Sequence, residues 1–297
     1  MIGRERGFLL LTSHLGDPVR KPLSVAQFRT LAQRVQAAEM PAKDRELTRD
    51  DLIRLGYGYE MAERIHNLLD EEARLDHYLT RGARAGCVPI VRGSEDYPLI
   101  LRKRLGLESP GVLWAKGDVS LLTQPTISLV GSREIAEKNR AFAREVGRQA
   151  AKQGYVLVSG NARGADRIAQ DSCLEAGGQV ISVVADELWK QNPGAGVLYL
   201  SEDSFDEEFS SQRALSRNRV IHGLGLKTFV AQSNFQSGGT WDGTVKNLRF
   251  SYSPVFCCDD GSEAMTQLAQ MGAQLIGMDD LDSIYDLKNS EENIFDR

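Results

Sequence analysis

Three short glycine-containing segments carry the residue types that bind phosphate. They are residues 131–133, 159–166 and 237–240, and each follows a stretch with the composition of a β-strand. Glycines let backbone amides approach a ligand, hydroxyls donate hydrogen bonds, and Arg133 and Arg163 add fixed positive charge. Glycines also make ordinary tight turns, but three such segments with two arginines favour phosphate binding.

A fourth segment, residues 213–221, concentrates cations. It holds three arginines together with Asn218, just before apolar positions. A charge cluster of this kind is usually a solvated helix face. Here it includes side chains that hydrogen-bond to phosphates, which favours a functional interpretation.

Several chemistries lack their usual sequence signals. No segment matches a Walker motif or a G-x-G-x-x-G dinucleotide fingerprint, so ATP hydrolysis and NAD-dependent redox chemistry are not indicated. The four cysteines include no Cys-x-x-Cys pair and the four histidines are scattered, so we expect no metal site and no cofactor. Cys257 and Cys258 lie in an apolar run and are expected in a buried strand in a reducing compartment.

The elements that must position these segments alternate from about residue 121 onward. Short β-branched or apolar runs at 127–130, 156–158, 180–184, 227–231, 255–258 and 274–276 predict strands. Helices are expected at 137–153, 165–176, 244–250 and 262–271. This order predicts an α/β fold, a Rossmann-like open parallel sheet with helices on both faces. Ligands of such sheets bind beyond the carboxyl ends of the strands, where the segments above would lie.

The rest of the chain predicts three further parts around the Rossmann-like domain at 121–280. Residues 1–80 are expected to be a helical N-terminal domain, 81–120 a linker or lead-in segment, and 281–297 an acidic tail. Apolar residues recur at helical spacing over 23–38 and 50–79, with Ser24 and Thr48 as candidate caps.

Two short helices joined at Gly56 are expected within the N-terminal domain. Such a pair can bind nucleic acid, but it is more often part of a small bundle, which we favour.

The charge is unevenly distributed. The formal net charge is −5, but residues 259–297 hold ten acidic and two basic side chains, so the preceding residues carry a net charge of +3. The overall charge therefore does not exclude a nucleic-acid partner, because such binding needs only a local basic face. The apolar run at 8–11 is too short for a signal peptide and no stretch could span a membrane, so we expect a cytoplasmic protein without membrane contact.

The order and spacing of these motifs resemble the DprA/Smf family of DNA-processing proteins. The resemblance covers about residues 86–280 and rests on segments 131–133, 159–166, 217–224 and 237–240, with Gly177-Gly178 and residues 271–273 before strands. It implies a Rossmann-like domain related to LOG-type phosphoribohydrolases, which binds single-stranded DNA, forms a homodimer and helps to load a RecA-type recombinase. It also implies no established catalytic activity, and we assign no catalytic residue.

The candidate DNA- or phosphate-binding residues share a place in one of these motifs. They are Gly131, Ser132, Arg133, Ser159, Gly160, Arg163, Gly164, Arg217, Asn218, Arg219, Ser237, Gly238, Gly239 and Thr240.

Departures from the family pattern predict a divergent member without the C-terminal winged helix. The segment before Arg217 lacks the family's Phe-Pro, and the chain ends in acidic residues. DprA-like proteins also occur as antitoxins in phage-defence toxin–antitoxin pairs, so a cognate toxin is a second candidate partner. The acidic tail, with Ile294 and Phe295 among its apolar residues, is expected to be solvated more often than to dock on a partner.

Two functional interpretations remain. The first is a non-enzymatic single-stranded-DNA-binding protein acting in DNA processing and recombination or as an antitoxin. The alternative is a nucleotide-binding sensor or a LOG-like phosphoribohydrolase, for which Asp242 is the nearest carboxylate after the 237–240 segment. Trp241 is equally compatible with stacking on a base and with packing in the core.

Overall fold

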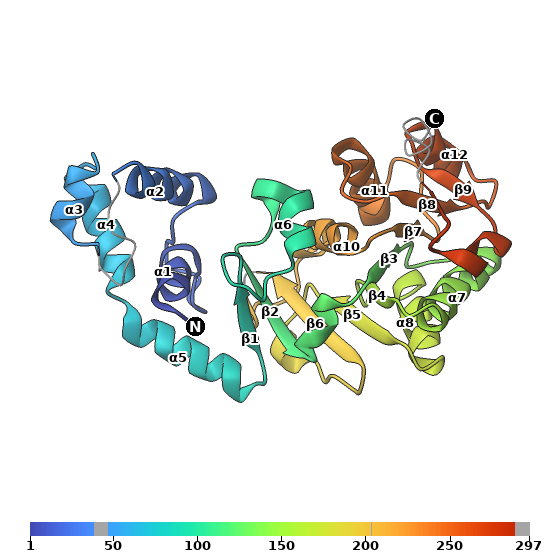
Figure 1. Ribbon diagram of the computed structural model, residues 1–297, viewed down its shortest axis with the longest axis horizontal. Helices are drawn as coiled ribbons and strands as arrows, with labels where there is room; N and C mark the ends of the chain where they lie inside the picture. Colours follow the sequence, from blue (N-terminus) through green and yellow to red (C-terminus); the bar gives the residue numbers. More distant parts are fainter. Residues whose placement is uncertain (39–46, 203, 289–297) are drawn as a thin grey trace.

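The protein is described by a computed structural model that covers residues 1–38, 47–202 and 204–288 (Figure 1). Within these ranges, nine strands form one sheet in the order β1-β2-β6-β5-β4-β3-β7-β8-β9. The strands are β1 (Val88–Val91), β2 (Val112–Gly117), β3 (Thr126–Val130), β4 (Val156–Ser159), β5 (Gln179–Val183), β6 (Val197–Glu202), β7 (Thr228–Val230), β8 (Val255–Cys258) and β9 (Gln274–Ile276).

Seven of these strands, from β6 to β9 in the sheet order, are parallel, and β1 and β2 pair antiparallel at one edge. The chain runs from β3 outward to β6 and then returns to place β7 on the other side of β3, so the strand order reverses at β3. The α/β, Rossmann-like fold class is thereby confirmed. The strand β6 is not predicted by the sequence, which indicates no strand between residues 184 and 227.

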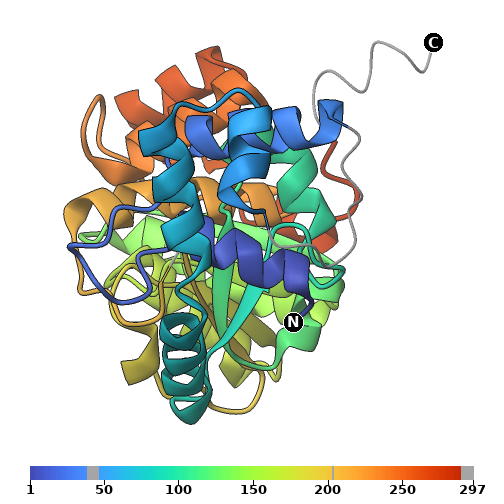
Figure 2. The same cartoon turned by 90° about the vertical axis from the view of Figure 1, so that its left-hand side faces the viewer.

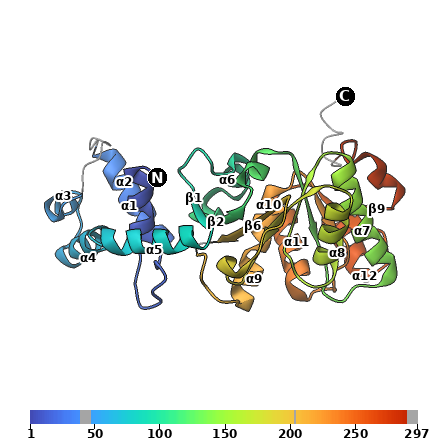
Figure 3. The ribbon, with the colours of Figure 1, turned by 90° about the horizontal axis from the view of Figure 1, so that it is seen from below.

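Helices cover both faces of the sheet (Figures 1 and 3). One face packs against α7 (Glu137–Lys152) and α8 (Ala165–Glu175), together with the short helix η4 (Asp279–Ser283). The other face packs against α6 (Leu99–Leu105), α10 (Asn218–Leu224), α11 (Gly238–Phe250) and α12 (Glu263–Gln270). The remaining short helices of this region are α9 (Ser211–Ser216), η1 (Gly106–Glu108), η2 (Val119–Thr123) and η3 (Leu188–Lys190).

The central strand β3 shows how the sequence fixes these two layers. Its side chains alternate, as the strand period requires, so that Ile127 and Leu129 enter the core beside α7 and α8. Thr126 and Ser128 face α10 instead, and their hydroxyls donate to the carbonyls of Leu224 at 2.6 Å and Ile221 at 2.5 Å. These bonds satisfy carbonyls near the end of α10 and fix that helix against the sheet.

The N-terminal residues form α1 (Gly3–Thr12), α2 (Val25–Ala37), α3 (Arg49–Arg54), α4 (Tyr59–Leu69) and α5 (Glu72–Arg84). These helices lie beyond the β1 edge in Figure 1 and nearest the viewer in Figure 2. The expected caps are confirmed, because the Ser24 and Thr48 side chains accept from backbone amides in the first turns of α2 and α3. The expected pair of short helices is also present: α3 and α4 meet near Gly56, which has a positive φ of 84°.

Aromatic packing attaches this helical region to the sheet. Tyr78 of α5, Trp114 of β2 and Phe205 form mutual ring contacts with centroids 4.7 to 5.4 Å apart. The segment 81–120, expected as a lead-in, contributes the strands β1 and β2 to the sheet and the helix α6, which packs against it. The boundaries of the four expected parts stay a prediction.

The first residues of the expected acidic tail pack against α7. Leu281 and Ile284 are buried, and Gln153 exchanges hydrogen bonds of 2.8 Å with the main chain of both. Ile294 and Phe295 lie outside the described residues.

Cys257 and Cys258 are buried in β8, as expected. Among the described residues, no helix is long and apolar enough to cross a membrane.

A buried histidine links α10 to α11 and makes stability depend on pH. His222 is fully enclosed, and its Nδ1 accepts a hydrogen bond from Asn247 Nδ2 at 3.0 Å. The orientation of the Asn247 amide is fixed because its Oδ1 accepts a hydrogen bond from the Ser253 backbone amide at 2.8 Å. Burial lowers the pKa of His222 from 6.5 to about 3. Between these two values the unfolded chain binds a proton that the folded chain does not, so the free energy of unfolding falls as pH decreases.

We expect this single group to contribute a slope of up to about 1.4 kcal/mol per pH unit below pH 6.5. The measurement is urea denaturation at pH 7, 6 and 5. His222→Gln, which does not titrate, should show a shallower decline over the same series. Parallel declines in the two proteins would contradict the assignment.

Candidate functional site

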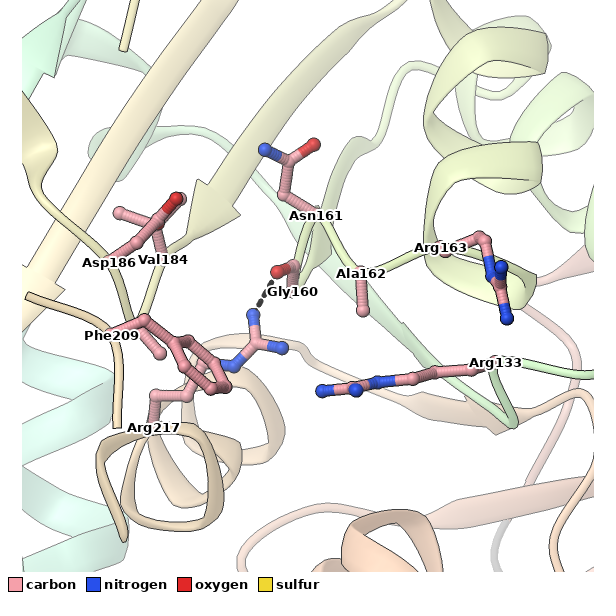
Figure 4. Close-up of a pocket in the computed structure, with 10 residues that line it drawn as sticks. Arg133, Gly160, Asn161, Ala162, Arg163, Val184, Asp186, Phe209 and Arg217 are labelled. Carbon is pink, nitrogen blue, oxygen red and sulfur yellow. Dashed lines mark hydrogen bonds between the residues drawn. The ribbon is translucent and has the colours of Figure 1, made fainter. Parts of the chain in front are cut away.

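The loops after β3, β4 and β5 converge on one pocket of about 260 Å³ (Figure 4). It is lined by Arg133, Gly160, Asn161, Ala162, Arg163, Val184, Ala185, Asp186, Phe209 and Arg217. These loops meet because the carboxyl ends of parallel strands share one edge of the sheet. The structure therefore brings segments 131–133 and 159–166 together with Arg217, as the sequence predicted.

Two arginines of this pocket are exposed and have unpaired side chains. Arg133 and Arg163 make no side-chain hydrogen bond or ion pair with any residue that the structure describes. Both come from neighbouring loops, and the Arg133 side chain points toward Arg217 while that of Arg163 stays near its own loop (Figure 4). An anion at this edge would meet two available guanidinium groups.

Arg217 has a different environment, although it also lines the pocket. It is only 8% exposed, and its Nη1 donates to the carbonyls of Gly160 after β4 and Val183 of β5. Its Nη2 lies 4.0 Å from Oδ2 of Asp166, while its Nε has no partner among the described residues. Arg217 thus ties α10 to the ends of two neighbouring strands.

The buried pair formed by Arg217 and Asp166 is electrostatically strained. Burial lowers the pKa of Arg217, and the Asp166 carboxylate opposes that shift. Burial raises the pKa of Asp166. The charge of Arg217 and the 3.3 Å hydrogen bond from the Ala162 amide oppose this shift. Neither group is stable in the interior without the other.

The two residues after Arg217 are also engaged within the protein. Arg219 pairs with Glu202 at 2.6 Å and donates to the Glu108 carbonyl at 2.9 Å. The Asn218 amide donates to the Gly239 carbonyl at 2.9 Å, which joins α10 to the start of α11. Phosphate contact by these side chains stays a prediction, and the structure gives them positioning contacts.

The serines of the first two segments hold the loops in place. The Ser159 hydroxyl is buried and donates to the Leu129 carbonyl at 2.8 Å, between β4 and β3. The Ser132 hydroxyl donates to the Gln232 carbonyl at 3.2 Å, which links the loops after β3 and β7.

The glycines allow close packing at the same place. A Cβ on Gly131 would lie 2.4 Å from the Cβ of Ala165, and one on Gly160 would lie 2.1 Å from the Arg217 guanidinium.

The third predicted segment lies next to the pocket but does not line it. Ser237 precedes α11, Gly238 has a positive φ of 84°, and Gly239 and Thr240 form the first turn. Trp241 follows, partly buried against the core and in edge contact with Phe235 at 5.3 Å, which favours the core interpretation.

Asp242, the carboxylate considered for hydrolysis, is exposed on α11 and does not line the pocket. In the ranges that the structure covers, no group of His, Cys, Asp or Glu side chains could hold a metal ion.

Sequence reasoning missed Asp186 and Phe209 as parts of the site. Asp186 follows β5, a strand that the sequence predicts. Its position just after the carboxyl end of that strand could therefore have identified Asp186 as a site residue. Phe209 lies between β6 and α9, and because β6 was not expected, nothing in the sequence placed Phe209 near the pocket.

Comparison with known proteins identifies similar chains. A family model described as DNA recombination-mediator protein A matches residues 89–286. DNA processing protein DprA of Streptococcus pneumoniae is 29% identical over 182 residues, covering 57% of this chain and 64% of the relative. The Bacillus subtilis DprA is 27% identical over 176 residues, covering 56% and 59%. The matched region thus spans about three fifths of the length of these relatives.

Solved structures show the same architecture. The crystal structure of S. pneumoniae DprA superimposes with a TM-score of 0.70 at 23% identity, covering 90% of this chain and 95% of that one. The Helicobacter pylori DprA structure, which is described as revealing the single-stranded DNA binding mode of that protein, gives 0.54 at 22% identity, covering 66% and 92%. At these identities the likeness shows a shared fold.

Proposed function

This chain belongs to the DNA recombination-mediator protein A family, the DprA/Smf proteins, and from that premise we propose that it binds single-stranded DNA without an enzymatic activity of its own. The observation that carries the proposal is the pair of exposed, unpaired arginines, Arg133 and Arg163, on adjacent loops at the carboxyl edge of the sheet. Phosphate groups of a DNA strand are the polyanion that such an edge would hold. Binding through the backbone gives affinity with a strong dependence on salt.

The contacts that hold the loops around Arg133 and Arg163 in place support the proposal. Arg217 and Asn218 use their side chains to fix the loops after β4 and β5 and the start of α11. The exposed cations then stand on a rigid edge, which lowers the entropy lost on binding. Asp242 lies outside the pocket, so the arrangement gives no support to the phosphoribohydrolase alternative.

We propose DNA processing and recombination as the biological role, with a homodimer and a RecA-type recombinase as the protein assembly. The antitoxin role is the alternative, and co-expression with a candidate toxin separates the two. Rescue of growth in that assay would favour the antitoxin, and stimulation of recombinase filament formation on DNA would favour the recombination role.

The test of DNA binding is fluorescence anisotropy with an oligo-dT strand across a range of salt concentrations. We expect Arg133→Ala and Arg163→Ala each to weaken binding roughly tenfold, because each removes a charge-assisted phosphate contact. Each should also reduce the slope of log K against log salt by about 0.7.

Lys152→Ala is the matched control, since Lys152 ends α7 at the opposite edge of the sheet. It should leave affinity and slope unchanged. Absence of binding at low salt, or equal effects of all three substitutions, would refute the proposal. Release of free base from a nucleoside monophosphate would support the hydrolase instead.

A further inference from the structure

An apolar groove opens between α2 and α4 in the N-terminal helical region. It has a volume of about 190 Å³ and is lined by Leu23, Ala26, Gln27, Thr30, Tyr57, Met61 and Ile65. Leu23 and Ile65 are buried members of the hydrophobic core of this region, so the groove leads directly onto that core. None of these residues lines the pocket at the carboxyl edge of the sheet. The α2–α4 groove is therefore a separate surface.

One wall of this groove contains a polar group without a partner. The Tyr57 ring lies under the Arg34 guanidinium, 4.3 Å from its centroid, and the Tyr57 hydroxyl is buried with no hydrogen-bond partner among the described residues. Burial raises the pKa of this hydroxyl, so it remains a protonated donor. Polar groups buried in folded proteins are normally hydrogen-bonded. An occupant of the groove that offers a carbonyl or carboxylate oxygen would supply the missing acceptor.

The helix on the other side of the groove is positively charged. Residues 21–37, which include α2, hold Lys21, Arg29 and Arg34 and no acidic side chain, a net charge of +3. Lys21 and Arg29 are exposed. Complementary charge favours association and selects the partner. The groove therefore fits a segment that combines apolar side chains with negative charge.

Residues 289–297, which lie outside the described residues, have this composition. The adjacent Ile294 and Phe295 stand between Glu292 and Asp296, and three acidic and one basic side chains give the segment a net charge of −2. A short run of this kind can place two apolar side chains in a groove while its carboxylates meet the cations of α2.

The start of this segment is fixed far from the groove. Lys288 precedes it, and its carbonyl accepts a hydrogen bond from the Gln274 side chain of β9 at 2.7 Å. β9 and the pair α2 and α4 lie toward opposite ends of the long axis of the molecule (Figure 1). Nine extended residues span at most about 30 Å, whereas a compact chain of this length is about 50 Å across. The groove is therefore out of reach within one molecule.

We propose that the α2–α4 groove binds residues 289–297 of a second copy of this chain, with Ile294 and Phe295 inserted between the two helices. The groove and the segment are different surfaces, so the contact is either reciprocal in an antiparallel pair or repeated head to tail. This self-association is independent of the proposed DNA binding.

The first experiment measures the fluorescence anisotropy of a labelled peptide, residues 288–297. Its partner is the full-length Phe295→Ser chain, whose own segment lacks the aromatic side chain. We expect saturable binding that weakens at least tenfold when the peptide carries Ile294→Ser or Phe295→Ser, because each change removes a buried apolar side chain.

A pair of substitutions on α2 tests the groove in the same background. Ala26→Glu places a negative charge in the groove and should weaken peptide binding by at least tenfold. Ala32→Glu is the matched control, since Ala32 is exposed on the same helix but does not line the groove. It should leave the affinity unchanged. Absence of peptide binding, or equal effects of the two substitutions, would overturn the inference.

The second experiment tests whether the contact joins two copies. In sedimentation velocity, full-length Ala26→Glu and full-length Phe295→Ser should each self-associate at least tenfold more weakly than the unmodified chain. An equimolar mixture should recover association, because the intact segment of one variant meets the intact groove of the other. A mixture that associates no better than the separate variants would refute a contact between copies. Both variants should bind oligo-dT as the unmodified chain does, so a failure of the proposed function is detected separately.

Discussion

Replacing Arg217 with alanine is expected to lower the free energy of unfolding by about 3–5 kcal/mol, the range for breaking a buried ion pair from one side. The substitution removes the donor to the Gly160 and Val183 carbonyls and leaves the buried Asp166 carboxylate without its cation. If Arg217 were a surface residue that only contacts phosphate, as the sequence predicts, its replacement would lower the free energy of unfolding far less. The size of the loss therefore separates the positioning role from simple surface charge.

Urea denaturation at pH 7 measures this loss, and a second substitution identifies its cause. Asp166→Asn in the Arg217→Ala background removes the stranded charge and should recover part of the stability. Lowering the pH should also reduce the penalty. Without Arg217 the pKa of the buried Asp166 rises further above its unfolded value, and protonation at low pH then relieves the buried charge. A loss below about 1 kcal/mol, typical of an exposed pair, would show that Arg217 is not a structural anchor.

The fold could be predicted where local periodicity carries the information. Strands such as β3 and β8 are short runs of β-branched or apolar residues, and the apolar residues of α7 follow the helical spacing. The sequence therefore predicts all three elements. Edge pairing could not be found in this way. β2 pairs with β6 through contacts such as Leu113 with Glu202, and no local pattern links residues so far apart in the chain.

The site could be predicted only as a set of loops. Residue types and their place after strands identified the segments containing Arg133 and Arg163, but not which way each arginine points. Arg217 and Arg219 have the same chemistry as Arg133, yet they turn inward because Asp166 and Glu202 are brought to them by tertiary packing. Asp186 and Phe209 joined the site only through the convergence of three loops.

Gly164→Ala is the second substitution for which we expect a large loss of stability. Gly164 precedes α8 with φ 93° and ψ −131°, a conformation that residues with a Cβ rarely adopt. A Cβ there would lie 2.4 Å from the Arg133 carbonyl oxygen and 2.5 Å from the Ser132 carbonyl oxygen. Both atoms are backbone, so a whole loop must move, and we expect a loss of about 3 kcal/mol or more from backbone strain and overpacking together.

Gly154→Ala isolates the steric part of this effect. Gly154 also has a positive φ, 75°, but a Cβ there would meet nothing within 4 Å. It should cost only about 1–2 kcal/mol, the penalty for a left-handed conformation. Equal losses from the two substitutions in urea denaturation would show that the loops after β3 and β4 are not in close backbone contact.

The same pair of variants connects the packing of the loops to the proposed binding. Gly164 is the point where the loop that carries Arg163 rests on the loop that carries Arg133, and the Ala165 amide donates to the Ser132 carbonyl at 3.2 Å. Gly164→Ala keeps both cations but changes their separation, so oligo-dT affinity should fall under conditions in which the variant is still folded. Gly154→Ala should bind as the unmodified chain does. If Gly164→Ala also bound normally while folded, the two arginines would act as independent surface charges, and the rigid edge would have no part in DNA binding.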